Sequence, residues 1–145
     1  MDADLRHVLF RAGGERFALP LESVTVVVPP APTFAHVPRT GPPVLGAMSL
    51  RGRVVAVVEM APLLGLPGRA PGDGGGQVLV LDRERRALGF LVDEVLGVEP
   101  VGPPERPGDG LPVKGLSTVR GSPVAVLDPD ALAAAAKRLF RGRAG

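Results

Sequence analysis

Short apolar runs separated by Gly and Pro dominate the hydrophobic pattern of this chain, and the densest of them spans residues 44–66. Arg51-Gly52 predicts a tight turn, because Gly accepts the positive φ that a sharp reversal needs. The β-branched run at residues 54–58 predicts a strand that is buried on both faces. Residues 60–65, which end in Gly, are typical of one helical turn. The segment therefore predicts a hairpin followed by a short helix.

The same pattern returns near the C-terminus, where residues 115–128 repeat residues 46–59 at a constant offset of 69 positions, from 51 to 120. A weaker similarity relates residues 17–24 to residues 88–95, since each is an apolar alternation that ends in an acid and a Val. Chance recurrence of Val-rich strands and Arg-Gly turns is the alternative explanation. The repeat predicts two similar subdomains whose equivalent strands bury Val55, Val57, Val124 and Val126.

The rest of the chain alternates strands with Gly- and Pro-rich connections. Further strands are expected near residues 5–12, 16–20, 24–28, 77–81, 87–92 and 95–101. Residues 31–43 and 102–112 are predicted as loops, and residues 66–76 as a flexible link. Asp128, followed by Pro129, predicts the N-cap of a C-terminal helix over residues 129–141.

Composition narrows the class of protein. The 145 residues include 20 Gly and 17 Pro, which favour many short strands over long helices. Cysteine is absent, which excludes disulfides and thiolate metal sites. The N-terminus lacks the layout of a signal peptide, and no apolar run reaches the length needed to cross a bilayer. We therefore expect a cytoplasmic protein with no direct membrane insertion.

Basic residues cluster at residues 83–86 and 137–143, although the net charge is only +2. Such clusters are commonly a solvated surface, and the other reading is a small basic barrel that binds nucleic acid non-specifically. The chain has 5 Phe and neither Trp nor Tyr, so it offers few side chains on which bases could stack. No specific nucleic-acid partner is expected.

Candidate catalytic chemistry is sparse. His7 and His36 are the only histidines, and neither has a metal-ligand companion at a suitable spacing. The serines lack the setting of a nucleophile elbow. Acids recur at the ends of the repeated strands, where structural caps are a simpler explanation than a catalytic pair: Glu22, Glu59, Asp93 and Asp128. We predict no enzymatic activity, no catalytic residues, no cofactor and no metal.

Four motifs in order resemble the CheW-like domain, the adaptor module of bacterial chemotaxis arrays. They are FRAGGERFALPLESV (10–24), VLGAMSLRGRVVAVVE (44–59), LGFLVDEV (88–95) and KGLSTVRGSPVAVLD (114–128). The resemblance implies a mainly β fold of two small five-stranded SH3-like β-barrel subdomains that share a core, with a C-terminal α-helix. The expected first barrel spans roughly residues 14–66 and the second roughly 77–128, with strand 5–12 added to the second.

The resemblance also implies a role and two partners. The family is non-catalytic and couples methyl-accepting chemoreceptors, through their signalling tip, to the regulatory domain of a CheA-type histidine kinase. The implied receptor-side residues are Val24, Val26, Arg51, Val92 and Val95. The implied kinase-side residues are Gly46, Gly52 and Arg53. For each residue, core packing or turn geometry is the alternative explanation.

The chain departs from the family's pattern at two places. The family usually has an acid at the position of Val26, where it can pair with the Arg of the Arg-Gly turn. It also favours Pro and Asp in the next strand, where this chain has Ala56 and Glu59. A salt bridge to Arg51 is therefore expected to be missing, and Val26 is expected on the surface. An accessory adaptor that binds only the receptor or only the kinase is the second hypothesis.

Overall fold

The computed structural model describes residues 5–69, 74–83 and 86–141. Eleven strands and two α-helices follow one another among these residues. The strands are β1 (Leu5–Ala12), β2 (Glu15–Pro20), β3 (Val26–Val28), β4 (Val44–Leu50), β5 (Arg53–Glu59), β6 (Gln77–Arg83), β7 (Arg86–Val92), β8 (Glu94–Val101), β9 (Arg106–Gly110), β10 (Val113–Val119) and β11 (Ser122–Leu127). The helices are α1 (Met60–Leu63) and α2 (Pro129–Arg141), with a 3₁₀ turn at Leu21–Ser23.

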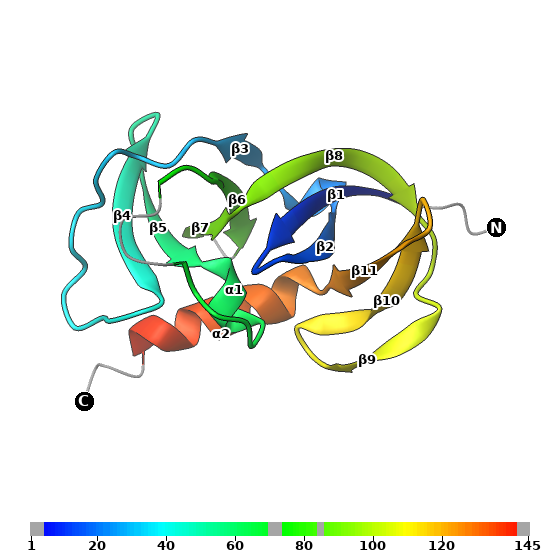
Figure 1. Cartoon of the computed structure of the whole chain (residues 1–145). Coiled ribbons are helices and arrows are strands. Elements are labelled where there is room, and N and C mark those ends of the chain that lie inside the picture. Colours follow the sequence, from blue (N-terminus) through cyan, green and yellow to red (C-terminus); the bar gives the residue numbers. More distant parts are fainter. Residues whose placement is uncertain (1–4, 70–73, 84–85, 142–145) are drawn as a thin grey trace.

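The strands form two sheets that lie side by side, with α2 beneath them (Figure 1). We call the five-stranded sheet, in the order β3-β6-β7-β5-β4, barrel 1. We call the six-stranded sheet, in the order β8-β1-β2-β11-β10-β9, barrel 2. Each barrel contains one parallel pair, β5 with β7 in barrel 1 and β11 with β2 in barrel 2. Every other pairing between neighbouring strands is antiparallel.

The residue ranges predicted for the two barrels are wrong in two respects. β1 lies in barrel 2 as expected, but β2 lies there too, and β6 and β7 belong to barrel 1. The reason is that the second strand of each Arg-Gly hairpin has a parallel partner from another hairpin, β7 beside β5 and β2 beside β11. The chain therefore passes from barrel 2 to barrel 1 after β2 and returns to barrel 2 after β7. Barrel 2 also has six strands instead of five, because β9 forms inside the region 102–112 that was predicted as a loop.

The predicted repeat is present in the backbone itself. The β4–β5 and β10–β11 hairpins turn at Arg51 and Arg120, each with φ of 52°. In each hairpin, the pairing of the first strand with the second is irregular near the start of the first strand. The register shifts between Val44 and Gly46 in β4 and between Val113 and Gly115 in β10. The parallel pairs agree as well, since Val57 lies opposite Gly89 and Val126 opposite Ala18. The four valines predicted to be buried in equivalent strands are at most 4% exposed: Val55, Val57, Val124 and Val126.

Three clusters of buried side chains make up the core of the part of the chain that the structure describes. One lies between the barrels and includes Phe10, Phe17, Leu79 and Phe90, with contributions from both helices. The second fills barrel 1, and the third fills barrel 2. The prediction that residues 54–58 are buried on both faces is wrong for its first residue, because Val54 is 75% exposed. The central cluster joins the barrels into one folding unit.

The C-terminal helix has the predicted bounds and the predicted cap. Asp128 Oδ1 accepts hydrogen bonds from the backbone N–H groups of Asp130 and Ala131, at 2.9 and 3.0 Å. Leu132, whose N–H donates to the carbonyl oxygen of Asp128, is completely buried in the shared core. The equivalent acid Glu59 precedes α1 but makes no such side-chain cap, which corrects the expectation for this residue. Among the described residues no helix is long and apolar enough to span a membrane.

Candidate protein-binding surface

The turn between β4 and β5 presents an exposed cation at one end of barrel 1. Arg51 and Gly52 occupy its two central positions, with φ of 52° and 80°. Gly accepts a positive φ at no steric cost, whereas an Arg does not, so the hairpin register must hold Arg51 there. Both residues are exposed, and Arg51 forms no ion pair with any described residue. The guanidinium is therefore available to an acidic partner, and the missing salt bridge agrees with the expectation.

Arg53, two residues further on, is held by an acid that comes from another strand. Its Nη2 lies 2.7 Å from Asp82 Oδ1, and Asp82 Oδ2 also accepts a hydrogen bond of 3.0 Å from Thr25 Oγ1. The hydrogen bond from Arg53 is the main reason why the pKa of Asp82 lies below its usual range, and Thr25 lowers it further. Asp82 in turn raises the pKa of Arg53. The three residues fasten the hairpin to the end of β6 and to the segment before β3.

Sequence reasoning missed Asp82 and Thr25. They are 57 positions apart, and Arg53 lies 29 positions from Asp82. Nothing local marks them, since Asp82 is one acid in a charged stretch that follows a strand. Only the register of β3 on β6, with Val26 opposite Val80, brings them together. A prediction of strand pairing would have been needed to find this network.

The two predicted receptor-side valines near β3 are half-buried. Val24 packs against the core between the barrels. Val26 packs against the cluster inside barrel 1, so the expectation that it lies on the surface is wrong in part. β3 is an edge strand of its sheet, so one side of its backbone pairs with no described strand. The backbone of β3, more than the side chain of Val26, is the accessible feature here.

Val92 and Val95 lie near the junction of the barrels and not beside Arg51. Val92 is 1% exposed and belongs to the shared core, so its side chain cannot be touched in this conformation. Core packing, the alternative explanation, therefore accounts for Val92. Val95 is half-buried on the edge strand β8, and its N–H donates to Gln77 Oε1 at 2.7 Å. In Figure 1, β3 and β8 run along the upper side of the molecule, above the place where the barrels meet.

The three predicted kinase-side residues fall into two places. Gly52 and Arg53 lie at the exposed turn, whereas Gly46 lies toward the other end of β4 and is buried. A Cβ on Gly46 would come within 2.5 Å of the carbonyl oxygen of Ala35, which is bridged to the neighbouring Ala47. The close approach of these two backbone segments thus explains why position 46 is a glycine. The structure brings together Arg51, Gly52 and Arg53, and leaves Gly46 apart from them.

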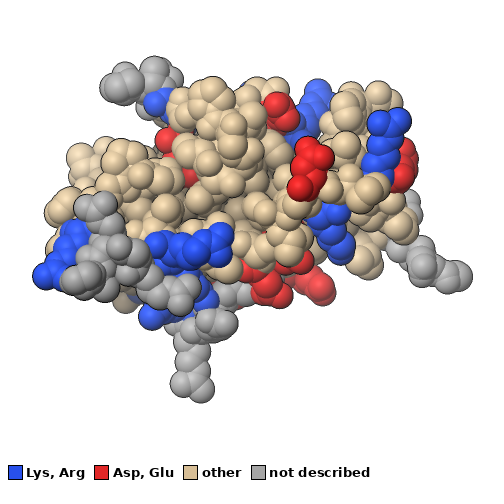
Figure 2. Space-filling model, turned by 90° about the horizontal axis from the view of Figure 1, so that it is seen from below, with Lys and Arg blue, Asp and Glu red and all other residues tan. Residues whose placement is uncertain are grey.

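A basic groove of about 510 Å³ lies beside the same hairpin. Its walls come from β5, β7 and α2, and its cations are Arg53, Arg86 and Lys137. Figure 2 shows Lys and Arg side chains gathered at the end of the molecule that carries barrel 1. Part of the predicted basic tail, residues 142–143, and residues 84–85 of the first basic cluster lie outside the described residues. Within the described residues, no group of three or more potential ligands could hold a metal ion.

Comparisons with known proteins identify the class of this fold. The family model of the CheW-like domain matches residues 6–137. The scaffolding protein TtCheW from Thermoanaerobacter tengcongensis superposes with a TM-score of 0.73 at 20% sequence identity, over 86% of this chain and 89% of that chain. No curated protein sequence matches the chain. The chain therefore belongs to the CheW-like domain family, and its fold is the predicted pair of SH3-like subdomains with a C-terminal helix.

Proposed function

We propose that this protein is a non-catalytic, cytoplasmic chemosensory adaptor that couples methyl-accepting chemoreceptors to a CheA-type histidine kinase. Membership of the CheW-like domain family over residues 6–137 supports the proposal. The fold offers two barrels around a common core, and so two separate surfaces on one rigid body. An adaptor needs such surfaces and needs no reacting groups.

One observation carries the receptor half of the proposal, namely that Arg51, at the end of barrel 1, is exposed and forms no ion pair with a described residue. The equivalent Arg120 in barrel 2 has the same φ of 52°, but its Nη2 lies 2.9 Å from Glu99 Oε2. Two turns of the same geometry thus differ in one respect, which is whether the cation is already neutralised. Arg51 suits an acidic group on a receptor tip, since an Arg can bind a carboxylate through two parallel hydrogen bonds.

The edge of β3 completes this receptor surface, and Arg53 holds β3 in place beside the turn. The Arg53–Asp82–Thr25 network ties the hairpin to the start of β3, so the two elements present a fixed shape to a partner. A preorganised surface loses less conformational entropy on binding than a mobile one. We assign Arg51 and β3 to the receptor contact, with Val24 and Val95 at its margin. We assign Gly52 and Arg53 to the adjoining kinase contact.

A titration against each purified partner tests the proposal. The partners are a chemoreceptor signalling tip and a CheA-type regulatory domain from the same genome as this chain. We expect Arg51→Glu to weaken receptor binding by about tenfold or more, because like charges placed together at an interface are strongly unfavourable. Arg120→Glu is the matched control and is expected to leave receptor binding unchanged. If the parent protein binds neither partner, the adaptor proposal is wrong.

A second candidate is an accessory adaptor that binds one partner only. The specific observation behind it is that Val26 replaces the family's usual acid, so Arg51 has no acid on β3. In that case the parent would bind the kinase domain and ignore the receptor tip, or the reverse. The same titration separates the two candidates, since only the coupling protein binds both partners.

A further inference from the structure

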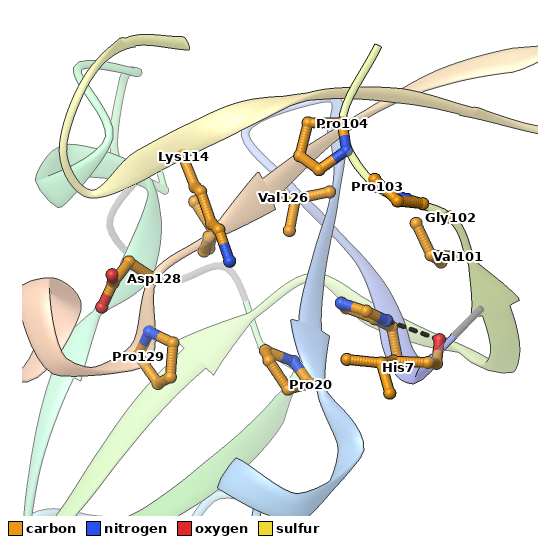
Figure 3. A pocket seen from close by; sticks show the side chains of 12 residues that line it. His7, Pro20, Val101, Gly102, Pro103, Pro104, Lys114, Val126, Asp128 and Pro129 are labelled. Carbon is orange, nitrogen blue, oxygen red and sulfur yellow. Dashed lines mark hydrogen bonds between the residues drawn. The ribbon is translucent and has the colours of Figure 1, made fainter. Parts of the chain in front are cut away.

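Barrel 2 has a pocket of about 470 Å³ at one end, and the adaptor role gives it no task. Four prolines form much of its wall: Pro20, Pro103, Pro104 and Pro129. Val101 and Val126 also line it, and both belong to the cluster inside barrel 2. Two polar side chains, His7 and Lys114, reach into it from opposite sides (Figure 3). The volume is within the usual range for sites that bind small molecules.

His7 is the strongest sign that the pocket has an occupant. The residue is 6% exposed, and its Nδ1 lies 2.8 Å from the carbonyl oxygen of Leu5. A carbonyl oxygen can only accept, so Nδ1 carries the hydrogen. Nε2 has no hydrogen-bond partner among the described residues, and Figure 3 shows this side of the ring facing the pocket. A buried polar atom without a partner is unusual in a folded protein and calls for a group that satisfies it.

Lys114 supplies a positive charge on the other side. It is exposed, it forms no ion pair with any described residue, and its side chain points into the pocket in Figure 3. Asp128 also lines the rim, but its Oδ1 already accepts two backbone N–H groups at the start of α2. The pocket therefore combines a cation, a hydrogen-bond acceptor in the neutral form of His7, and an apolar wall.

The equivalent positions in barrel 1 hold apolar side chains that pack inside the barrel. The paired residues His7 and Pro20 correspond to the paired Val78 and Leu91, which are 0% and 8% exposed inside barrel 1. Lys114 and Pro103 correspond, 69 positions away, to Leu45 and Phe34, which also pack against the barrel 1 cluster. Four apolar or bulky positions that close one barrel are thus a His, a Lys and two prolines in the other. Apolar side chains therefore close this end of barrel 1, whereas the same end of barrel 2 is left open as the pocket.

We propose that this pocket binds a small organic acid that has an apolar or aromatic group and, next to its carboxylate, a hydroxyl or amino group. The carboxylate pairs with Lys114, and the neighbouring O–H or N–H donates to His7 Nε2. The apolar part lies against the prolines and Val126. A simple anion would leave the acceptor on His7 unsatisfied, and a purely apolar ligand would leave both polar groups without partners.

The test is a titration of the full chain with mandelate, followed by amide and histidine-ring NMR signals. Mandelate should shift the ring signals of His7 and the amides around the pocket, while those of His36 stay in place. Phenylacetate lacks the hydroxyl group and phenylethylene glycol lacks the carboxylate, and both should bind more weakly. Lys114→Met should weaken mandelate binding by about tenfold or more, as expected for loss of a charge-assisted hydrogen bond.

The chain offers matched controls, because Lys137 is its only other lysine and His36 its only other histidine. Lys137→Met and His36→Val should leave binding unchanged, whereas His7→Val should weaken it. The double variant His7→Val/Lys114→Leu carries the residues of barrel 1 and should fold without binding. If this variant does not fold, Lys114→Met still decides, since Lys114 is exposed. Binding that survives Lys114→Met, or no His7 shift with mandelate, phenyllactate or phenylalanine, would overturn the proposal.

Discussion

The two barrels have the same frame and differ in what they present at their ends. Their hairpins turn at Arg51 and Arg120 with the same φ, and their central valines are buried to the same degree. Arg120 is neutralised by Glu99, whereas Arg51 is not paired with any described residue. Conversely, barrel 1 is filled where barrel 2 opens into a pocket beside His7. Positions that agree between the barrels hold the fold, and positions that differ are where binding should be sought.

The largest effect should come from the core that the barrels share. Phe90 in barrel 1 and its counterpart Leu19 in barrel 2 are both 0% exposed in this cluster. We expect Phe90→Ala to lower the free energy of unfolding by about 3–5 kcal/mol and Leu19→Ala by about 2–5 kcal/mol. Each variant should still unfold in a single transition in urea, followed by circular dichroism. Two separate transitions would mean that the barrels unfold independently, as two domains and not as one folding unit.

A smaller effect should distinguish the edge strands. Val26 on β3 is half-buried against the barrel 1 cluster, while Val98 on β8 is 43% exposed. Val26→Glu places a carboxylate against apolar side chains, so we expect a loss of about 1–3 kcal/mol. Val98→Glu, its control, should stay within about 0.5 kcal/mol of the parent. Thermal melting of both variants measures the difference, and equal melting temperatures would show that β3 is as exposed as β8.

The two turns give a finer test. Gly is the residue that a positive φ favours, so Arg51→Gly should raise the free energy of unfolding by up to about 1 kcal/mol. The free energy of unfolding should rise less for Arg120→Gly, because this change also removes the ion pair with Glu99. An ion pair at an exposed site is worth about 0–1 kcal/mol. Urea unfolding of both variants compares them directly. If the free energy of unfolding rose more for Arg120→Gly than for Arg51→Gly, the ion pair of Arg120 with Glu99 would not stabilise its turn.

The smallest expected effect is on stability at acidic pH. The folded pKa of Asp82 lies below its usual value, so its pairing with Arg53 stabilises the fold above the ordinary titration range of an Asp. This stabilisation should disappear as the pH falls through the lowered pKa. Melting temperatures measured from neutral pH down to about 3 should therefore fall more for the parent than for Asp82→Asn. Asp109→Asn, on the exposed β9 of barrel 2, is the control and should follow the parent.

The sequence was sufficient for local structure and for the repeat, and insufficient for the pairing of distant strands. The Asp128 cap, the bounds of α2 and the positive φ at Gly52 follow from short patterns whose physics is local. The exchange of β2 and β6–β7 between the barrels does not, because a parallel partner is chosen by packing across the whole molecule. Asp82, Thr25 and the pocket at His7 were missed for the same reason, since each needs residues that only the sheet register brings together. Val92 shows the converse error, in which a residue taken from a family surface is part of the core here.

The exchange of strands between the barrels also has a consequence for synthesis on the ribosome. β1 emerges first, yet its partner β8 ends at Val101, which lies opposite Leu5 in the sheet. At about 5–20 residues per second, the first hairpin waits on the order of 5–20 s for this neighbour. Barrel 1 is likewise incomplete until β7 has been made, and only then can β5 find its parallel partner. We expect nascent chains of this protein to stay sensitive to protease until most of the chain has been translated.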